Sequence, residues 1–166
     1  MAIRHLASFL ALPFMMAGVI PWMLARNATI DWSSRSPASL VATALVLIAG
    51  LLLFASSLYE FVTRGRGTLA PWDPPRELVV RGPYRFVRNP MITGVVVIII
   101  GEAMLLSSRP VLQWAAIFAV INMMYIPLLE EPFLLQRFGD AYREYCRNVP
   151  RLFPRFTPWT QSPPPA

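Results

Sequence analysis

Residues that carry chemistry are scarce in this chain of 166 residues, and their scarcity excludes several classes of protein. Lysine is absent, so the chain has neither a Schiff-base lysine nor a phosphate-binding loop of the Walker type. The single cysteine, Cys146, excludes an intrachain disulfide and a metal site built from several cysteines. The single histidine, His5, leaves no His-based zinc cluster and no Ser-His triad outside the N-terminal tail. We therefore expect no metal site.

Charge is also scarce. Charged residues make up 14% of the chain and hydrophobic residues 55%, with a mean hydropathy of +0.49, whereas soluble domains carry about 25% charged residues. Such a chain is too apolar for disorder and has too few polar side chains to cover a surface facing water. The net charge of +6 comes with no basic segment interleaved with base-stacking aromatics away from the apolar runs, so no nucleic-acid partner is expected. The composition predicts an all-α integral membrane protein.

Four apolar runs approach the length of about 20 residues that a helix needs to cross a bilayer. They cover residues 6–25, 38–59, 91–108 and 111–129. Only Ser108, Arg109 and Pro110 separate the last two runs, which predicts a tight antiparallel hairpin. Prolines inside the runs, such as Pro127, are expected to mark kinks rather than helix ends. The first run is too long for a signal peptide and is interpreted as an uncleaved anchor.

The distribution of arginine predicts the orientation of these spans. With the N-terminus inside, twelve of the fifteen arginines lie on the cytoplasmic side: Arg4, six between residues 64 and 88, and five between residues 137 and 155. The other three, Arg26, Arg35 and Arg109, lie outside. The positive-inside rule therefore places both termini in the cytoplasm.

Two polar segments then share the cytoplasmic face. The first, residues 63–90, is rich in Gly and Pro and is expected to be irregular. The second follows the fourth run and repeats apolar residues at helical spacing, which predicts an amphipathic helix that lies in the membrane interface or packs on the first segment. The chain is accordingly divided into a two-helix membrane region (1–62), a region of loop, helical hairpin and amphipathic helix (63–155) and a disordered proline-rich tail (156–166). The apolar positions of the amphipathic helix are Leu134, Phe138, Ala141, Tyr142 and Tyr145.

Charged and polar groups beside the apolar runs are candidates for chemistry, because burying them is costly unless something binds them. Glu130 and Glu131 follow the fourth run: they could face a ligand, or they could form a solvated helix end in which Glu131 caps a new helix. Asn89 before Pro90 reads as the cap of the third span, where free N–H groups and the helix dipole also favour an anion. Glu102 lies within the third run and is expected to face the bundle, to pair with a polar neighbour such as Asn122, or to be protonated.

An ordered set of short motifs resembles the isoprenylcysteine carboxyl methyltransferase and phospholipid methyltransferase superfamily. The set consists of LVVRGPYRFVRNPM at residues 78–91, an apolar hairpin, Glu130-Glu131, FGDAY at residues 138–142 and Val149-Pro150. The likeness covers about residues 63–155. It implies an integral membrane enzyme that uses S-adenosylmethionine and releases S-adenosylhomocysteine, here in the inner membrane of a bacterium.

The resemblance also implies which residues hold the cofactor. They are Arg76, Glu77, Leu78, Val79, Tyr84, Asn89, Pro90, Met91, Ile92 and Glu130, with Glu131 as a neighbour. Two positions depart from the eukaryotic carboxyl methyltransferases, which have His in place of Asn89 and a substrate-binding Arg in place of Ile126. The second departure argues against a carboxylate substrate.

Methyl transfer from a sulfonium is an in-line displacement that needs alignment and exclusion of water. No side chain is an evident strong general base, so the acceptor is expected to be nucleophilic already, and no catalytic residue is assigned. The expected partners are membrane lipid and a small or lipophilic acceptor, such as a lipid amine, a thiol or an isoprenoid-type molecule. Two alternatives remain open: an NADPH-dependent membrane reductase of related fold, and a non-catalytic membrane subunit.

Overall fold

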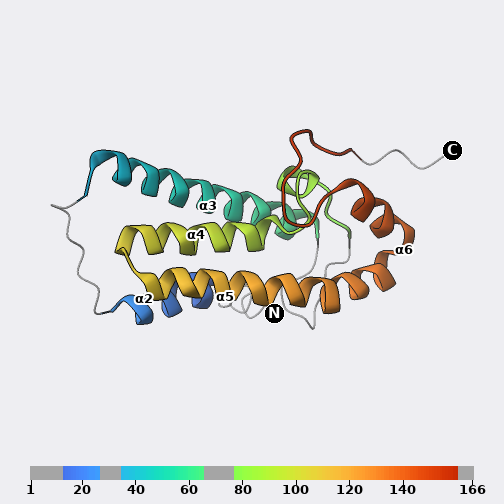
Figure 1. Cartoon of the computed structure of the whole chain (residues 1–166). Coiled ribbons are helices and arrows are strands. Elements are labelled where there is room, and N and C mark those ends of the chain that lie inside the picture. Colours follow the sequence, from blue (N-terminus) through green and yellow to red (C-terminus); the bar gives the residue numbers. More distant parts are fainter. Residues whose placement is uncertain (1–12, 27–34, 66–76, 161–166) are drawn as a thin grey trace.

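The computed structural model describes residues 13–26, 35–65 and 77–160. Within these residues every regular element is a helix and none is a strand, as the composition predicted. Figure 1 shows long helices side by side, with a shorter helix behind them and a last helix that bends back at one end. In chain order the elements are η1 (Met15–Val19), α2 (Ile20–Ala25), α3 (Pro37–Arg64), η2 (Gly82–Arg85), α4 (Pro90–Leu106), α5 (Arg109–Tyr125), η3 (Ile126–Glu130) and α6 (Glu131–Asn148).

Helices α3 and α4 approach each other closely. A Cβ atom added at Gly94 of α4 would lie 2.8 Å from the backbone nitrogen of Phe54 on α3, and one added at Gly50 of α3 would lie 2.9 Å from the backbone nitrogen of Ile98. Small residues at these two positions bring the backbones together, which is how helices pack tightly where lipid removes the hydrophobic drive to associate. The pair therefore forms one closely packed unit (Figure 1).

Helices α4 and α5 form the predicted hairpin. Helix α4 ends at Leu106, Ser107 turns the chain in a left-handed conformation (φ 47°), and the hydroxyl of Ser108 accepts a hydrogen bond from the Val111 backbone at the start of α5. Arg35 donates to the carbonyls of Met104 and Leu105 at 3.0 and 2.6 Å. The last carbonyls of a helix have no intrahelical donor, and this arginine supplies hydrogen bonds to two of those carbonyls at the C-terminal end of α4.

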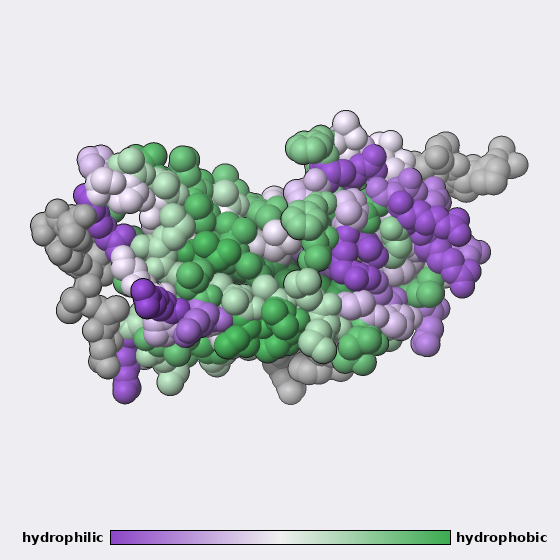
Figure 2. Space-filling model, in the orientation of Figure 1, coloured by the Kyte–Doolittle hydropathy of each residue, from purple (hydrophilic) through white to green (hydrophobic). Residues whose placement is uncertain are grey.

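Two helices are long and apolar enough to cross a membrane among the residues that the structure describes. They are Pro37–Arg64 and the continuous helix Arg109–Asn148, and both are mostly exposed along their apolar windows. Figure 2 shows a hydrophobic band over the middle of the molecule, with hydrophilic residues gathered at its two ends. A wide exposed apolar band is suited to lipid and unsuited to water. The apolar helices Met15–Ala25 and Pro90–Leu106 are shorter, and residues 6–12 of the first predicted span lie outside the described residues, so the count of four spans stays a prediction.

The expected pairing of Glu102 with Asn122 is absent. The Asn122 amide donates instead to the Phe118 carbonyl of its own helix, at 2.8 Å. One oxygen of the Glu102 carboxylate is buried and has no hydrogen-bond partner within the described part of the chain. The sequence pattern could place both residues in the membrane region but could not establish that the two side chains meet.

Helix α5 continues through η3 into α6, so Pro127 does not end the helix, as predicted. The wider π-helical turn of η3 accommodates the proline, which cannot donate to the preceding turn. The predicted amphipathic helix is interrupted at one point. Gly139 has φ 55° and ψ −127°, which breaks the helical path and separates Leu134 and Phe138 from Tyr142 and Tyr145 by a bend.

The last part of the chain packs on the loop before α4 (Figure 1). Tyr142, Tyr145 and Val149 are buried together, and Leu78 and Val80 of the loop pack against them. Of the two predicted positions for the last helix, packing on the first polar segment is therefore the one observed. We call residues 149–160 the C-terminal segment. Disorder was predicted from residue 156. Within this tail Trp159 packs on Tyr145 with ring centroids 5.9 Å apart, and residues 161–166 lie outside the described residues.

Candidate functional site

The loop before α4 is fixed by backbone hydrogen bonds to distant residues. The Tyr145 hydroxyl donates to the Tyr84 carbonyl at 2.8 Å. The C-terminal segment adds bonds from the Trp159 nitrogen to the Arg85 carbonyl and from the Arg155 nitrogen to the Phe86 carbonyl, both at 3.0 Å. An irregular loop near a membrane needs such partners, because its N–H and C=O groups have no regular ladder.

Glu131 is the centre of an ion-pair network that joins three segments. Its carboxylate accepts from Arg88 at 2.8 Å and from two nitrogens of Arg151 at 2.8 and 2.5 Å. The hydrogen bond to Glu131 is the main reason that the pKa of Arg151 is raised. The two arginines that donate to this carboxylate, one from the loop and one from the C-terminal segment, hold the start of α6 against the loop. Glu131 is therefore neither a solvated helix end nor a capping residue.

Glu130 has a different environment. No described residue donates a hydrogen bond to its carboxylate. Burial raises the pKa of the Tyr84 phenol above its usual range, and the charges of Tyr145, Glu130 and Glu60 raise it further. The Tyr84 hydroxyl is thus within electrostatic reach of carboxylates from α3 and from η3. Tyr84 and Glu130, two of the residues that the resemblance implied, therefore interact electrostatically.

Asn89 occupies the cap position of α4, and Pro90 follows at the first helical position, as predicted. The expected side-chain cap is absent, because the Asn89 amide makes no hydrogen bond to the helix. Its backbone carbonyl instead accepts from the Thr93 hydroxyl at 3.0 Å. The Asn89 amide and the first-turn N–H groups of Met91 and Ile92 therefore remain available to a ligand, since first-turn donors have no intrahelical acceptor.

The other implied residues are distributed around this loop. Val79, Pro90 and Met91 are buried, and Leu78 packs against the cluster around Tyr142 and Tyr145. The Glu77 nitrogen donates weakly to the Gly65 carbonyl at 3.4 Å. Arg76 lies outside the described residues. The Arg88–Glu131 ion pair connects the residue before Asn89 with the residue after Glu130, so the loop and η3 are held together.

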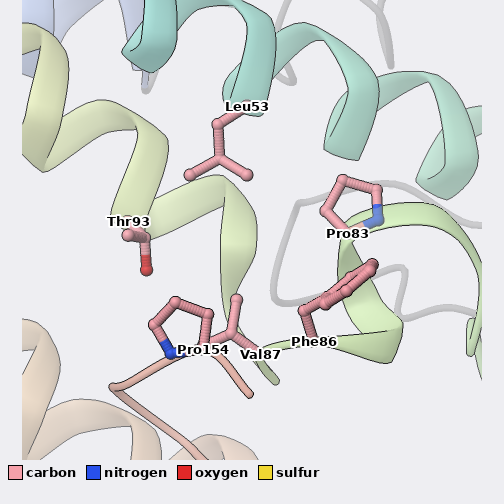
Figure 3. Close-up of a pocket in the computed structure, with 6 residues that line it drawn as sticks. All are labelled: Leu53, Pro83, Phe86, Val87, Thr93 and Pro154. Atoms are coloured by element: carbon pink, nitrogen blue, oxygen red, sulfur yellow. The ribbon is translucent and has the colours of Figure 1, made fainter. Parts of the chain in front are cut away.

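An apolar cavity of about 310 Å³ lies beside the loop. Figure 3 shows that its walls come from Leu53 on α3, Thr93 on α4, the loop residues Pro83, Phe86 and Val87, and Pro154 of the C-terminal segment. Its one polar wall residue, Thr93, already uses its hydroxyl on the Asn89 carbonyl. Hydrocarbon suits such a lining better than a charged group does.

Sequence reasoning missed one candidate residue, Glu60. An added Cβ at Gly82 would lie 3.0 Å from the Glu60 Cγ atom, so this carboxylate stands against the turn that carries Tyr84. Helix α3 has 28 residues, a length of about 42 Å at 1.5 Å per residue, and extends beyond a hydrocarbon core of about 30 Å. The sequence signal that could have identified Glu60 is a charged residue in the last turns of a long apolar helix.

The sequence profile of the phospholipid methyltransferase family matches residues 38–141. The chain belongs to this family. The match runs from the start of α3 through Ala141 of α6 and so contains Glu60, Tyr84, Asn89 and Glu130. The resemblance drawn from the motifs lies in the same superfamily, but the profile begins earlier and ends before Val149-Pro150. Neither the curated proteins nor the solved structures include a match to the chain.

Proposed function

We propose that this family member transfers a methyl group from S-adenosylmethionine to an amine of a membrane lipid at the cytoplasmic membrane surface. The observation that supports this most is that Asn89 and Glu130, whose side chains have no hydrogen-bond partner among the described residues, directly neighbour the two residues of the Arg88–Glu131 ion pair. The family description supplies the reaction type.

The polar groups around the loop fit the two ends of this cofactor. Asn89 and the N–H groups of Met91 and Ile92 would hold the carboxylate of its methionine part, because a helix N-terminus favours an anion. Glu130 would accept from cofactor hydroxyls or offset the positive charge, and Tyr84 would line the same site. When bound, S-adenosylmethionine supplies an electrophilic methyl group on a sulfonium. Arg76, Glu77, Leu78 and Val79 complete the proposed set.

An amine acceptor is favoured by the charges near Tyr84. Glu60 and Glu130 both act on this phenol, and carboxylates attract an ammonium group and can take the proton that it must lose before its nitrogen attacks. The position at which carboxyl methyltransferases have a substrate-binding arginine holds Ile126, which is 3% exposed. With an apolar side chain at this position, a carboxylate acceptor is disfavoured.

The apolar cavity beside the loop suits the hydrocarbon part of such an acceptor. Leu53 of α3 and Thr93 of α4 lie on its walls (Figure 3), and Thr93 is bonded to Asn89. A lipid chain entering from the bilayer would bury apolar surface there and place its headgroup next to the loop.

Binding and transfer test the proposal together. The full chain in detergent is titrated calorimetrically with S-adenosylhomocysteine and with NADPH, and a labelled methyl donor is then supplied with lipid amines. We expect binding of S-adenosylhomocysteine alone and label in the lipid headgroup. Binding of NADPH would favour the reductase, and binding of neither would favour a non-catalytic subunit.

Glu60 provides a sharper test of the acceptor. Glu60→Gln is expected to raise KM for a lipid amine by about tenfold, a loss of about 1.4 kcal/mol, because one carboxylate near the acceptor is lost. Affinity for S-adenosylhomocysteine should stay within about twofold, since Glu130 and Asn89 are intact. An unchanged KM would remove Glu60 from the acceptor site.

A further inference from the structure

A second cavity, of about 370 Å³, lies where η3 passes into α6, and its lining is basic. Arg88, Arg143 and Arg147 contribute to its walls, and Glu131 is the acidic residue among the described residues that line it. Apart from Glu131, none of the residues proposed to hold the cofactor lines this cavity. Its volume lies near the lower end of the range for small-molecule sites.

The charge of Glu131 is already compensated. Its two oxygens accept from Arg88 and Arg151, and its side chain is 15% exposed. A carboxylate shared by two arginines leaves the group with a net positive charge. The walls of the cavity therefore carry a cationic surplus, and the surplus favours an anionic occupant.

Arg88 has hydrogen-bonding capacity that the described protein groups do not use. One terminal nitrogen, Nη1, donates to Glu131 and contacts the Cys146 sulfur at 3.0 Å. Its Nε atom is buried and has no partner within the described residues, and the side chain is only 13% exposed. Buried charged donors are costly to leave unpaired, and Arg88 is one of the residues that line the cavity, so its guanidinium group favours an anionic acceptor there.

Arg143 forms only an exposed ion pair, and Arg147 forms no ion pair with any described residue. Arg143 pairs with Asp140 at 2.9 Å, but both side chains are largely exposed, and such surface pairs contribute little. Arg147 is exposed and forms no ion pair with any described residue. Both guanidinium groups are therefore free to turn toward an anion, and their planar shape matches the oxygens of a phosphate.

The cavity lies where the apolar surface ends. Pro127 and Pro132 also line it, and the neighbouring Leu128 and Leu129 are 65% and 61% exposed. Side chains this apolar and this exposed belong against lipid, so the cavity opens at the level of the lipid headgroups. The anion that a membrane presents at this level is a phosphodiester, and basic pockets beside membrane helices on the cytoplasmic side bind anionic headgroups.

We propose that this cavity binds the phosphate group of an anionic membrane phospholipid, at a site separate from methyl transfer. Arg88 forms the fixed part of the site, because Glu131 holds it in place. Arg143 and Arg147 form the adjustable part on α6. Occupancy would anchor α6 at the membrane surface without using Asn89, Tyr84 or Glu130.

Cys146 provides a reporter for the test, because it lines the cavity and is the one cysteine in the chain. The rate at which iodoacetamide alkylates it is measured in a zwitterionic detergent while phosphatidylglycerol is added. We expect phosphatidylglycerol to slow the alkylation and phosphatidylcholine to leave it nearly unchanged. Equal protection by both lipids would show that the cavity does not recognise the net negative charge of an anionic phospholipid and would overturn the proposal.

Variants separate this site from general attraction of basic residues to the membrane. In the double variant Arg143→Gln, Arg147→Gln, the phosphatidylglycerol concentration that gives half of the maximal protection of Cys146 should rise about 25-fold. This estimate follows because each arginine near a membrane surface contributes about fivefold in affinity. Arg137→Gln is the matched control, because Arg137 is exposed on α6 but does not line the cavity. An equal loss in the control would overturn the proposal.

Two further measurements distinguish a lipid from a soluble phosphate compound, and this cavity from the methyl-transfer site. Inorganic phosphate at millimolar concentration should protect Cys146 poorly, and protection equal to that by phosphatidylglycerol would assign the cavity to a soluble phosphate compound instead. Affinity for S-adenosylhomocysteine should be the same in the double variant and the control. A parallel loss of cofactor affinity and lipid protection would show that the cavity is part of the methyl-transfer site.

Discussion

Glu130 and Glu131 are neighbours in the chain, but their carboxylates have different surroundings. Glu131 is held by Arg88 and Arg151, whereas no described residue donates to Glu130. Adjacent helical residues point about 100° apart, so one side chain can serve the fold while the other faces a ligand. We therefore propose that Glu131 stabilises the fold and that Glu130 binds the cofactor.

Replacing Glu130 tests the binding task. Glu130→Gln should weaken binding of S-adenosylmethionine by at least about tenfold, or about 1.4 kcal/mol, because a charge-assisted hydrogen bond is lost in a poorly hydrated site. Glu144→Gln on the exposed side of α6 is the control and should bind as the unchanged protein does. Calorimetric titration measures both variants, and equal effects would return Glu130 to the role of a helix end.

Asn89 offers a second test at this scale, because its amide does not cap α4. Asn89→Asp should lose cofactor affinity severely, since it places a negative charge against the carboxylate that we assign to this helix end. Asn89→Ser should lose affinity only mildly. Thermal unfolding without cofactor should be nearly the same for both, because Asp and Ser are equally good caps. Comparable affinities of the two variants for S-adenosylhomocysteine would contradict this orientation of the cofactor.

Among the helices, α3 and α4 pack closely against each other at Gly94. Gly94→Ala should destabilise the protein by about 1–3 kcal/mol, because the new methyl group would meet backbone atoms of Phe54 that cannot move aside. Gly18→Ala is the matched control: its methyl group would meet only the Phe14 ring at an ordinary 3.4 Å. Thermal unfolding in detergent compares the two. A loss of stability as large at Gly18 as at Gly94 would show that helix packing is not the cause.

Local signals explain which helices could be predicted. The predicted runs 91–108 and 111–129 differ by only a few residues from α4 (Pro90–Leu106) and from α5 with η3. The signals that define these bounds, namely Pro90, Ser108 and the apolar runs, lie within or directly beside the helices themselves. The bend at Gly139 was not predicted, because a glycine inside a periodic pattern is compatible with either a continuous or a broken helix.

Contacts between distant residues explain which parts of the site could not be predicted. The two arginines that bind Glu131 are 43 and 20 residues away, and no periodicity links positions at such separations. The pairing of Glu102 with Asn122 was wrong for the same reason. The motifs could identify Asn89 and Glu130 as members of one set, but the ion pair that joins their segments depends on the fold.

For the molecule as a whole, the distribution of arginine still predicts four spans with both termini inside. A topology reporter fused at Arg35 should lie on the opposite side of the membrane from one fused after the C-terminal segment. Accessibility of the two reporters to an impermeant reagent in intact cells measures this. Both reporters on one side would require an even number of crossings between them and would contradict the four-span topology.

The attachment of Trp159 to Arg85 has a consequence for the order in which the protein is assembled. These residues are 74 positions apart, and their backbones and the Arg85 side chain are joined by hydrogen bonds of 2.7 and 3.0 Å. During synthesis the loop with Tyr84 and Asn89 emerges first, then all of α4, α5 and α6, and only afterwards the tryptophan that fixes the loop. Helices can enter the bilayer one after another, but the loop gains its final partners last. Cofactor affinity should therefore appear as a late step of biogenesis, after membrane insertion of the helices is complete.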